Sequence, residues 1–149
     1  MKIAYFDCFA GISGDMTLGA LVDAGLSFKT LQQELSKLHL NEFELQSHKV
    51  KKHSISATKI DVHHQEGHVH RHLKDVLEII DNSDISQTAK QKAGHVFRRL
   101  AEAEAEVHGS PIEDVHFHEV GAVDAIVDVV GTVVGLEALG IERIYASKL

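Results

Sequence analysis

Residues 116–131 read HFHEVGAVDAIVDVVG, and this stretch guides the interpretation of the rest of the chain. Its first part predicts an extended segment over 115–119. In such a segment His116 and His118 leave the same face, because side chains alternate along a strand. Glu119 adds a carboxylate directly beside them. The start of the stretch therefore predicts a small group of side chains that can bind a metal ion.

After Gly121 the apolar spacing becomes that of a helix. Small and acidic residues share one narrow helical face, at 100° per residue: Asp124, Asp128, Gly131 and Gly135. Valine and isoleucine occupy the other faces, as in a buried helix. Two carboxylates four residues apart on such a helix repel each other unless a cation or a hydrogen-bonding ligand pairs with them. The alternative is a core helix whose two aspartates are satisfied within the protein.

The N-terminal residues predict a strand over 2–7, a glycine-containing turn and a helix over 17–24. Asp7 falls at the carboxyl end of the strand, where α/β proteins often place chemistry. Asp15 falls near the start of the helix, where it can act as a cap or as a metal ligand. Free backbone N–H groups at such a helix start can also hold an anion. The alternative is a tight turn with an aspartate cap.

Residues 63–73 read HHQEGHVHRHL and contain an unusual concentration of histidine. His68, His70 and His72 share a face if the segment is extended, and imidazole suits nickel, zinc and copper. Two alternatives stay open. The histidines can be solvated in a polar loop, or they can form an anion site together with Arg71.

The remaining segments predict a single domain over 1–149. Helices are expected at 28–40, 73–80 and 86–108, an antiparallel hairpin from 43–50 and 54–63, and a last strand at 143–146. The predicted fold class is mixed α/β, with a partly antiparallel sheet and packed helices in a two-layer α/β sandwich.

The composition is that of a globular protein, with 44% hydrophobic and 25% charged residues and a formal net charge of −7. The negative charge argues against a nucleic-acid-binding surface. A single cysteine and the lack of a signal peptide or membrane-length apolar run predict a cytoplasmic protein with no membrane contact. Twelve histidines are more than packing or catalysis usually requires, and they favour metal binding.

Two long motifs go beyond these generic patterns: FDCFAGISGDM at 6–16 and HFHEVGAVDAIVD at 116–128. With HRHL at 70–73 and the segment 101–109, they resemble the LarC family, the nickel-insertion proteins of lactate-racemase cofactor synthesis. The resemblance covers essentially the whole chain. It implies a CTP-dependent cyclometallase that inserts nickel into pyridinium-3,5-bisthiocarboxylic acid mononucleotide. It also implies that this chain is the N-terminal part of a longer protein, whose C-terminal region carries the CTP site with Mn or Mg.

The resemblance and the physical arguments together lead to a hypothesis about the site. Carboxylates that complete a metal shell or accept a proton are Asp7, Asp15, Glu119, Asp124 and Asp128. Transient nickel ligands are His68, His70, His72, His116 and His118. Groups that hold the nucleotide phosphate are Gly11, Ser13, Gly14 and Arg71. Cys8 is expected to be a buried filler residue rather than a nucleophile.

The implied partners are the mononucleotide substrate, the C-terminal region or its separate chain, and lactate racemase, and homo-oligomerisation is left open. Two other functions stay open as well. One is a non-catalytic nickel-binding or delivery module. The other is a metal-dependent phosphohydrolase built on Asp7, Asp15, Asp124 and Asp128.

Overall fold

The computed structural model describes residues 1–40, 43–64, 71–117 and 121–148. The helices are α1 (Gly14–Asp23), α2 (Phe28–Ser36), α3 (Leu73–Asp81), α4 (Gln87–His108), a short 3-10 turn η1 (Ile112–Asp114) and α5 (Val123–Ala138). The strands are β1 (Ile3–Phe6), β2 (Phe43–Lys52), β3 (Ile55–His64), β4 (Arg71–His72), β5 (His116–Phe117) and β6 (Arg143–Ala146). None of the helices in these residues is both long and apolar enough to cross a membrane.

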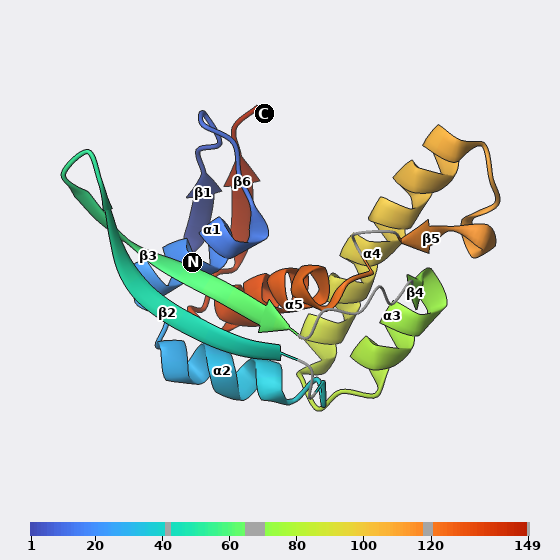
Figure 1. The fold of residues 1–149 in the computed structure, drawn as a ribbon, viewed down its shortest axis with the longest axis horizontal. Coiled ribbons are helices and arrows are strands. Elements are labelled where there is room, and N and C mark those ends of the chain that lie inside the picture. Colours follow the sequence, from blue (N-terminus) through green and yellow to red (C-terminus); the bar gives the residue numbers. More distant parts are fainter. Residues whose placement is uncertain (41–42, 65–70, 118–120, 149) are drawn as a thin grey trace.

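Helix α5 lies at the centre of the molecule (Figure 1). It contacts α1, α2, α4 and β3, and buried residues occur on most of its circumference. Ile126, Val127 and Val130 are fully buried. The buried helix that the valine-rich sequence predicts is therefore confirmed, and the apolar spacing accounts for it because no side of α5 faces open water over its full length.

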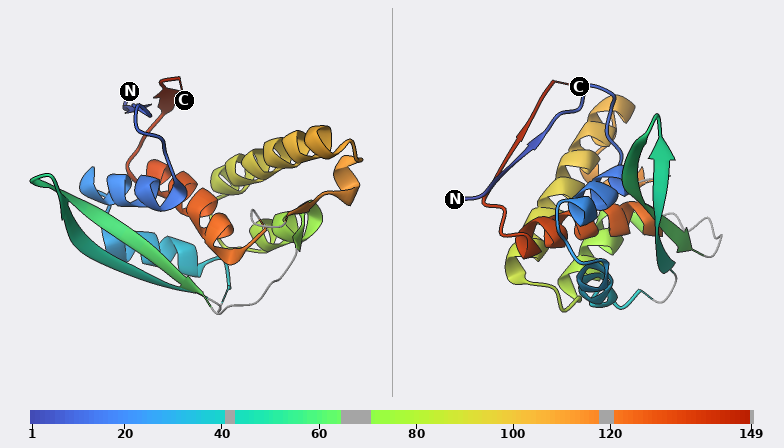
Figure 2. Two further views of the ribbon diagram at one scale, coloured as in Figure 1. Left: turned by 45° about the horizontal axis from the view of Figure 1, so that its top comes forward. Right: turned by 90° about the vertical axis from the view of Figure 1, so that its left-hand side faces the viewer.

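The strands form three separate pairs within the described residues. β2 and β3 make an antiparallel hairpin in register Phe43↔His64 to Lys52↔Ile55. β4 pairs antiparallel with β5, and β1 pairs parallel with β6. The mixed α/β class is confirmed, but the strands do not join into the one sheet that a two-layer sandwich implies. The hairpin covers the helices on one side, and the β1–β6 pair projects from the helical body (Figure 2).

The other predicted elements match the structure closely. The hairpin, the helices that begin near residues 28, 73 and 87, and the last strand are all found. Leu31 and Leu35 on α2 and Leu38 just after it are buried as predicted. Helix α1 begins at Gly14, three residues earlier than the predicted start at 17.

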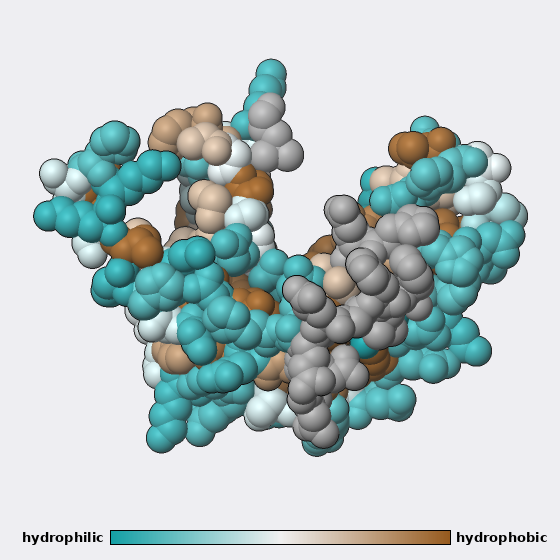
Figure 3. All heavy atoms as spheres, viewed as in Figure 1, coloured by the Kyte–Doolittle hydropathy of each residue, from teal (hydrophilic) through white to brown (hydrophobic). Residues whose placement is uncertain are grey.

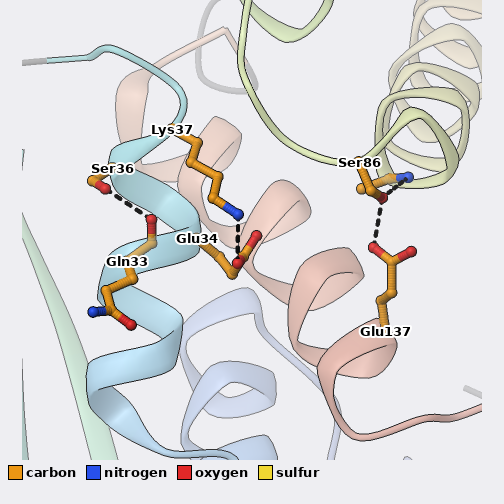
Figure 4. A network of polar contacts seen from close by, with 7 residues as sticks. Gln33, Glu34, Ser36, Lys37, Ser86 and Glu137 are labelled. Carbon is orange, nitrogen blue, oxygen red and sulfur yellow. Dashed lines mark hydrogen bonds and ion pairs between the residues drawn. The ribbon is translucent and has the colours of Figure 1, made fainter.

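A polar contact fixes α4 against the C-terminal end of α5. Ser86 caps α4 by accepting a hydrogen bond from the Ala89 backbone N–H at 3.0 Å. Its hydroxyl donates to Glu137 Oε2 at 2.7 Å (Figure 4). A separate contact lies at the C-terminal end of α2, where the residue after the helix, Lys37, donates to Glu34 Oε1 at 2.6 Å (Figure 4). A serine cap of this kind satisfies a backbone donor that the helix leaves free, and here it also links two helices.

Candidate functional site

The acidic site is placed by the way α1 packs against α5. A Cβ atom on Gly131 would lie 2.9 Å from Leu18 Cδ2, and a Cβ on Gly135 would lie 2.9 Å from Leu21 Cδ1. Nearer the start of α1, Gly14 lies against the side chain of Asp128. Residue numbers rise together along both helices, so α1 and α5 run parallel at close approach. Their N-terminal ends therefore lie at the same end of the pair.

Asp128 is the central residue of this end. Its side chain is half-buried, and its Oδ1 atom is buried with no hydrogen-bond partner among the residues that the structure describes. An added Cβ on Gly14 would lie only 2.2 Å from Asp128 Oδ2, so glycine is required there for the carboxylate to fit. Burial raises the pKa of Asp128 to about 7, and the negative charges of Asp15 and Asp124 raise it as well. At neutral pH the ionisation of Asp128 is therefore opposed by its burial and by the negative charges of its two neighbours.

Asp15 and Asp124 complete the acidic cluster, which consists of Asp15, Asp124 and Asp128. Asp15 lies in the first turn of α1, and Asp124 lies in the first turn of α5. The Ser13 hydroxyl donates to Asp15 Oδ1 and accepts from the Met16 backbone N–H. The residue that caps α1 is therefore Ser13, and the interpretation of Asp15 as the cap is wrong. Both carboxylates lie at helix N-termini, where the helix dipole favours negative charge.

A lysine that the sequence analysis did not identify lies beside the cluster. The hydrogen bond from Lys59 to Asp61, 2.7 Å long, raises the pKa of Lys59, and the charge of Asp15 acts in the same direction. His48 Nδ1 lies 3.3 Å from Asp61 on the neighbouring strand. The only signal in the sequence is the alternation of Lys59, Asp61 and His63 along β3, which places the three on one face. The contact of α1 with β3, together with the effect of the Asp15 charge on Lys59, places Lys59 near Asp15.

Asp7 and Gly11, in the segment before α1, are not part of the acidic cluster. Asp7 is exposed after β1 and, with Cys8 and Gly11, lines a cavity of about 490 Å³ between β1, α1 and the end of α5. It is not among the charges that raise the pKa of Asp128. Cys8 is buried as expected, and its backbone N–H donates to Ser147 Oγ at 2.8 Å. Gly11 adopts a positive φ of 85° in the turn before α1.

The structure brings two of the predicted histidines together. His72 and His116 are partners in the β4–β5 register, and their ring centroids lie 3.9 Å apart. Next to His72, the side chain of Arg71 is buried and donates to the Gly121 carbonyl at 2.9 Å. This bond ties β4 to the segment that leads into α5. His68, His70, His118 and Glu119 lie outside the described residues.

The arrangement can attract a cation, but it is not a closed metal shell. Among residues 1–40, 43–64, 71–117 and 121–148, no three histidine, cysteine or acidic side chains are grouped closely enough to hold a metal ion. Asp128 Oδ1, which has no hydrogen-bond partner among the described residues, and the two neighbouring carboxylates of Asp15 and Asp124 are hard oxygen donors of the kind that Mg²⁺ or Mn²⁺ prefers. The paired imidazoles of His72 and His116 suit a softer ion such as Ni²⁺.

Comparison with known proteins finds a family and several relatives that are all described as nickel insertion proteins. The family described as "Nickel insertion protein" matches residues 4–149. A "Pyridinium-3,5-bisthiocarboxylic acid mononucleotide nickel insertion protein" of Desulfitobacterium hafniense is 58% identical over 149 residues, which is all of this chain and 37% of that relative. A protein of the same name from Geobacillus kaustophilus is 50% identical and is covered over 39% of its length. A "Putative nickel insertion protein" of Dictyoglomus thermophilum is 47% identical and is also covered over 39%.

No solved structure matches this chain. The chain spans well under half the length of the curated relatives it matches. The match of the family to residues 4–149 nevertheless takes in both long motifs and every element from α1 to β6. The chain belongs to the nickel insertion protein family.

Proposed function

We propose that this chain is the N-terminal domain of a nickel-inserting enzyme that acts on pyridinium-3,5-bisthiocarboxylic acid mononucleotide. In this proposal the chain supplies a divalent-cation site and the residues that accept a proton during metallation. The names of two relatives support this substrate, because both include the mononucleotide and the proteins are 58% and 50% identical to this chain. The use of CTP with Mn or Mg, and the nickel-pincer product that serves lactate racemase, follow from the resemblance to the LarC family.

One observation carries the role of the chain. Asp128 is a half-buried carboxyl group whose Oδ1 has no hydrogen-bond partner in the described part of the chain and whose pKa is raised to about 7. A carboxyl group of this kind has two uses in such a reaction. It can bind a divalent cation, which relieves the repulsion from Asp15 and Asp124. It can also act as a general base, because its pKa lies near neutral pH.

The proton balance of the reaction gives the base a defined task. When nickel bonds to a ring carbon, the C–H bond at that carbon breaks and its proton must leave. The electron pair of that bond becomes the bond to nickel, and the two sulfur atoms of the substrate complete the ligand set. A carboxylate with a pKa near 7 accepts such a proton and returns it to water. We assign this step to Asp128 or to a neighbouring carboxylate of the acidic cluster.

The start of α1 fits the nucleotide phosphate in this scheme. Gly11, Ser13 and Gly14 form the turn and the first position of the helix, where backbone N–H groups favour an anion. A phosphate there would lie beside three carboxylates, which repel it. A cation between them removes this conflict, and Mg²⁺ commonly bridges protein carboxylates and substrate phosphates in this way. Arg71 is assigned a supporting role through its bond to Gly121.

Nickel itself is substrate in this reaction, and we assign its transient binding to the histidines. The pair His72 and His116 is the best placed of the described candidates. His68, His70 and His118 stay in the proposal on their sequence pattern, as does Glu119. Asp7 is proposed to act at the separate cavity beside β1 rather than in the acidic cluster.

The experiment uses a chimaera in which these 149 residues replace the matching segment of the Desulfitobacterium hafniense relative. The chimaera is incubated with Ni²⁺, CTP, Mg²⁺ and the mononucleotide, and the nickel–carbon product is measured by mass spectrometry. We expect the Asp128→Asn and Asp15→Asn variants to lose at least about 100-fold in rate, the usual contribution of a general base or a charge-stabilising group. Asp114→Asn, on an exposed aspartate of η1, is the matched control.

Three results would contradict the proposal. Turnover by Asp128→Asn at the parent rate would remove the acidic cluster from the chemistry. Nickel binding by the isolated chain that is unaffected by nucleotide, together with an inactive chimaera, would favour a delivery module. Hydrolysis of simple phosphoesters with Mg²⁺ that depends on Asp15 and Asp128 would favour the phosphohydrolase. For that last activity Asp7 is poorly placed, because it lines a different cavity.

A further inference from the structure

The β1–β6 ribbon, consisting of Ile3–Phe6 and Arg143–Ala146, is covered unusually little for a parallel pair of strands. All four residues of β6 are exposed, and β1 alternates between exposed and half-buried residues. Parallel strands in globular proteins are normally covered on both faces and belong to larger sheets. A two-stranded sheet alone is marginal in water. The ribbon therefore contains the apolar residues of a buried sheet, but the described residues leave much of it exposed.

Exposed apolar side chains concentrate at this place. Tyr5 is 65% exposed, Ile144 is 54% exposed and Tyr145 is 49% exposed. Phe9, in the loop after β1, is 88% exposed. Figure 3 shows apolar atoms gathered over β1 and β6, whereas the surface of the hairpin is mainly polar. Apolar surface that gathers in one place in this way marks an interaction site.

Both outer edges of the ribbon are also open. β1 pairs only with β6 among the described residues, and β6 pairs only with β1. Each strand thus presents one row of backbone N–H and C=O groups that no other described strand accepts. Open edges of this kind are templates for another strand. A cavity lies on either side of the ribbon, one of about 490 Å³ next to α1 and one of about 480 Å³ between α4, α5 and Ile144.

We infer that the ribbon is the docking surface for the part of the longer family members that this chain does not cover. That part is the larger share of each relative, since the chain spans only 37% to 39% of them. In this arrangement it adds at least one strand to an open edge and places apolar side chains in the two cavities. A second copy of this chain is a poorer occupant. Pairing about a two-fold axis covers one edge of the ribbon and leaves the other edge and its cavity open.

The test compares the 149-residue chain with the chimaera described above, in which the remaining part is present. The two tyrosines of the chain both lie on the ribbon, so their nitration reports on this surface alone within the 149 residues. Docking predicts that backbone amide exchange in 3–6 and 143–146 slows at least about tenfold in the chimaera. It also predicts that nitration of Tyr5 and Tyr145 falls by a similar factor. Exchange at the hairpin tip, residues 52–55, is expected not to change.

A pair of variants separates docking from misfolding. Tyr145→Lys in the chimaera is expected to restore fast exchange in 3–6, while exchange in α5 stays slow and reports an intact core. Ile55→Lys, at an apolar residue 72% exposed on the hairpin, is the matched control and is expected to leave the protection in place. Equal exchange in the chain and the chimaera would overturn the inference. Protection that appears in the isolated chain as its concentration rises, with a dimer seen by light scattering, would also overturn it and assign the surface to a second copy.

Discussion

The proposed function depends on one carboxyl group, which the fold holds in an environment unfavourable to its charge. Asp128 is half-buried against Gly14, with Oδ1 unpartnered and two aspartates nearby. Repulsion of this kind reduces the stability of the fold, so its presence requires a compensating role. In the proposed function cation binding supplies one, because a divalent ion would offset the negative charges of Asp128 and its two acidic neighbours.

The first prediction concerns the loss of folding stability caused by the charge of Asp128. The pKa of Asp128 is raised from 3.8 to about 7 in the folded chain. Between these values the folded state binds more protons than the unfolded state, so the free energy of unfolding falls as pH rises through this window. Asp128→Asn removes the effect. It is expected to stabilise the metal-free chain by about 1–2 kcal/mol at pH 7.5, after allowing for the water that reaches the half-buried side chain.

Urea unfolding in a chelator, at intervals from pH 4 to pH 8, measures this difference. The gain from Asp128→Asn should be small at pH 4 and should grow toward pH 7.5. Asp114→Asn serves as the control, with no comparable gain at any pH. A stabilisation by Asp128→Asn that is the same at pH 4 and pH 7.5 would show that charge at Asp128 is not its cause.

At the scale of the elements, the site exists because α1 and α5 approach closely and run parallel. Gly131 and Gly135 leave room for Leu18 and Leu21, and this contact brings the N-terminal ends of both helices together. The β2–β3 hairpin is held to α1 by a separate anchor. Asp23 accepts hydrogen bonds from Lys49 Nζ at 2.6 Å and from the Thr58 backbone N–H at 2.7 Å.

The helix contact predicts a strong effect of a larger residue at position 131. Gly131→Val adds side-chain atoms where even a Cβ lies 2.9 Å from Leu18 Cδ2. We expect a loss of about 1–3 kcal/mol, the usual cost of overpacking a core. Ala138→Val, at an exposed residue of the same helix, is expected to change stability by less than about 0.5 kcal/mol. Thermal unfolding measures both, and equal effects of the two changes would place α1 farther from α5 than the structure does.

The hairpin anchor predicts a different pH dependence. The hydrogen bonds from Lys49 and then from Thr58 lower the pKa of Asp23 from 3.8 to about 2. Because the folded pKa is lowered, the stabilisation is present above pH 4 and is lost as pH falls toward 2. Asp23→Asn is expected to cost about 1 kcal/mol at pH 7, since the side chain is partly exposed, and less at pH 2.5. Urea unfolding at the two pH values tests this, and a cost that is equal at both would contradict the assignment.

At the scale of the whole molecule, the sequence predicts which residues share a face of one helix or strand better than it predicts which helices and strands contact each other. The spacing of Asp124, Asp128, Gly131 and Gly135 predicts one narrow face on a buried helix, and that face is the one that meets α1. Periodicity carries such information because it depends only on the geometry of a single element. Asp15 and Asp124 both lie near enough to Asp128 for their charges to raise its pKa, and Gly14 packs against the Asp128 side chain, so the structure brings the start of α1 to α5 as the site hypothesis requires.

Long-range pairing is what the sequence does not predict. Nothing in the local pattern indicates that β4 pairs with β5, and this pairing is what places His72 against His116. The same holds for β1 with β6, and for Lys59 beside Asp15. Asp7, which follows β1 as predicted, lines the cavity beside that strand, and its charge is not among those that raise the pKa of Asp128.

The central claim is that the acidic cluster binds a divalent cation through Asp128, and calorimetric titration tests it most directly. Mn²⁺ is added to the 149-residue chain and to its Asp128→Asn variant at pH 6.5, in two buffers of different ionisation enthalpy. The claim predicts binding with release of a proton from the parent chain, and at least about tenfold weaker binding without proton release in the variant. The variant remains folded, since removing the charge is expected to stabilise it. Equal affinity and equal proton release in the two proteins would contradict the claim.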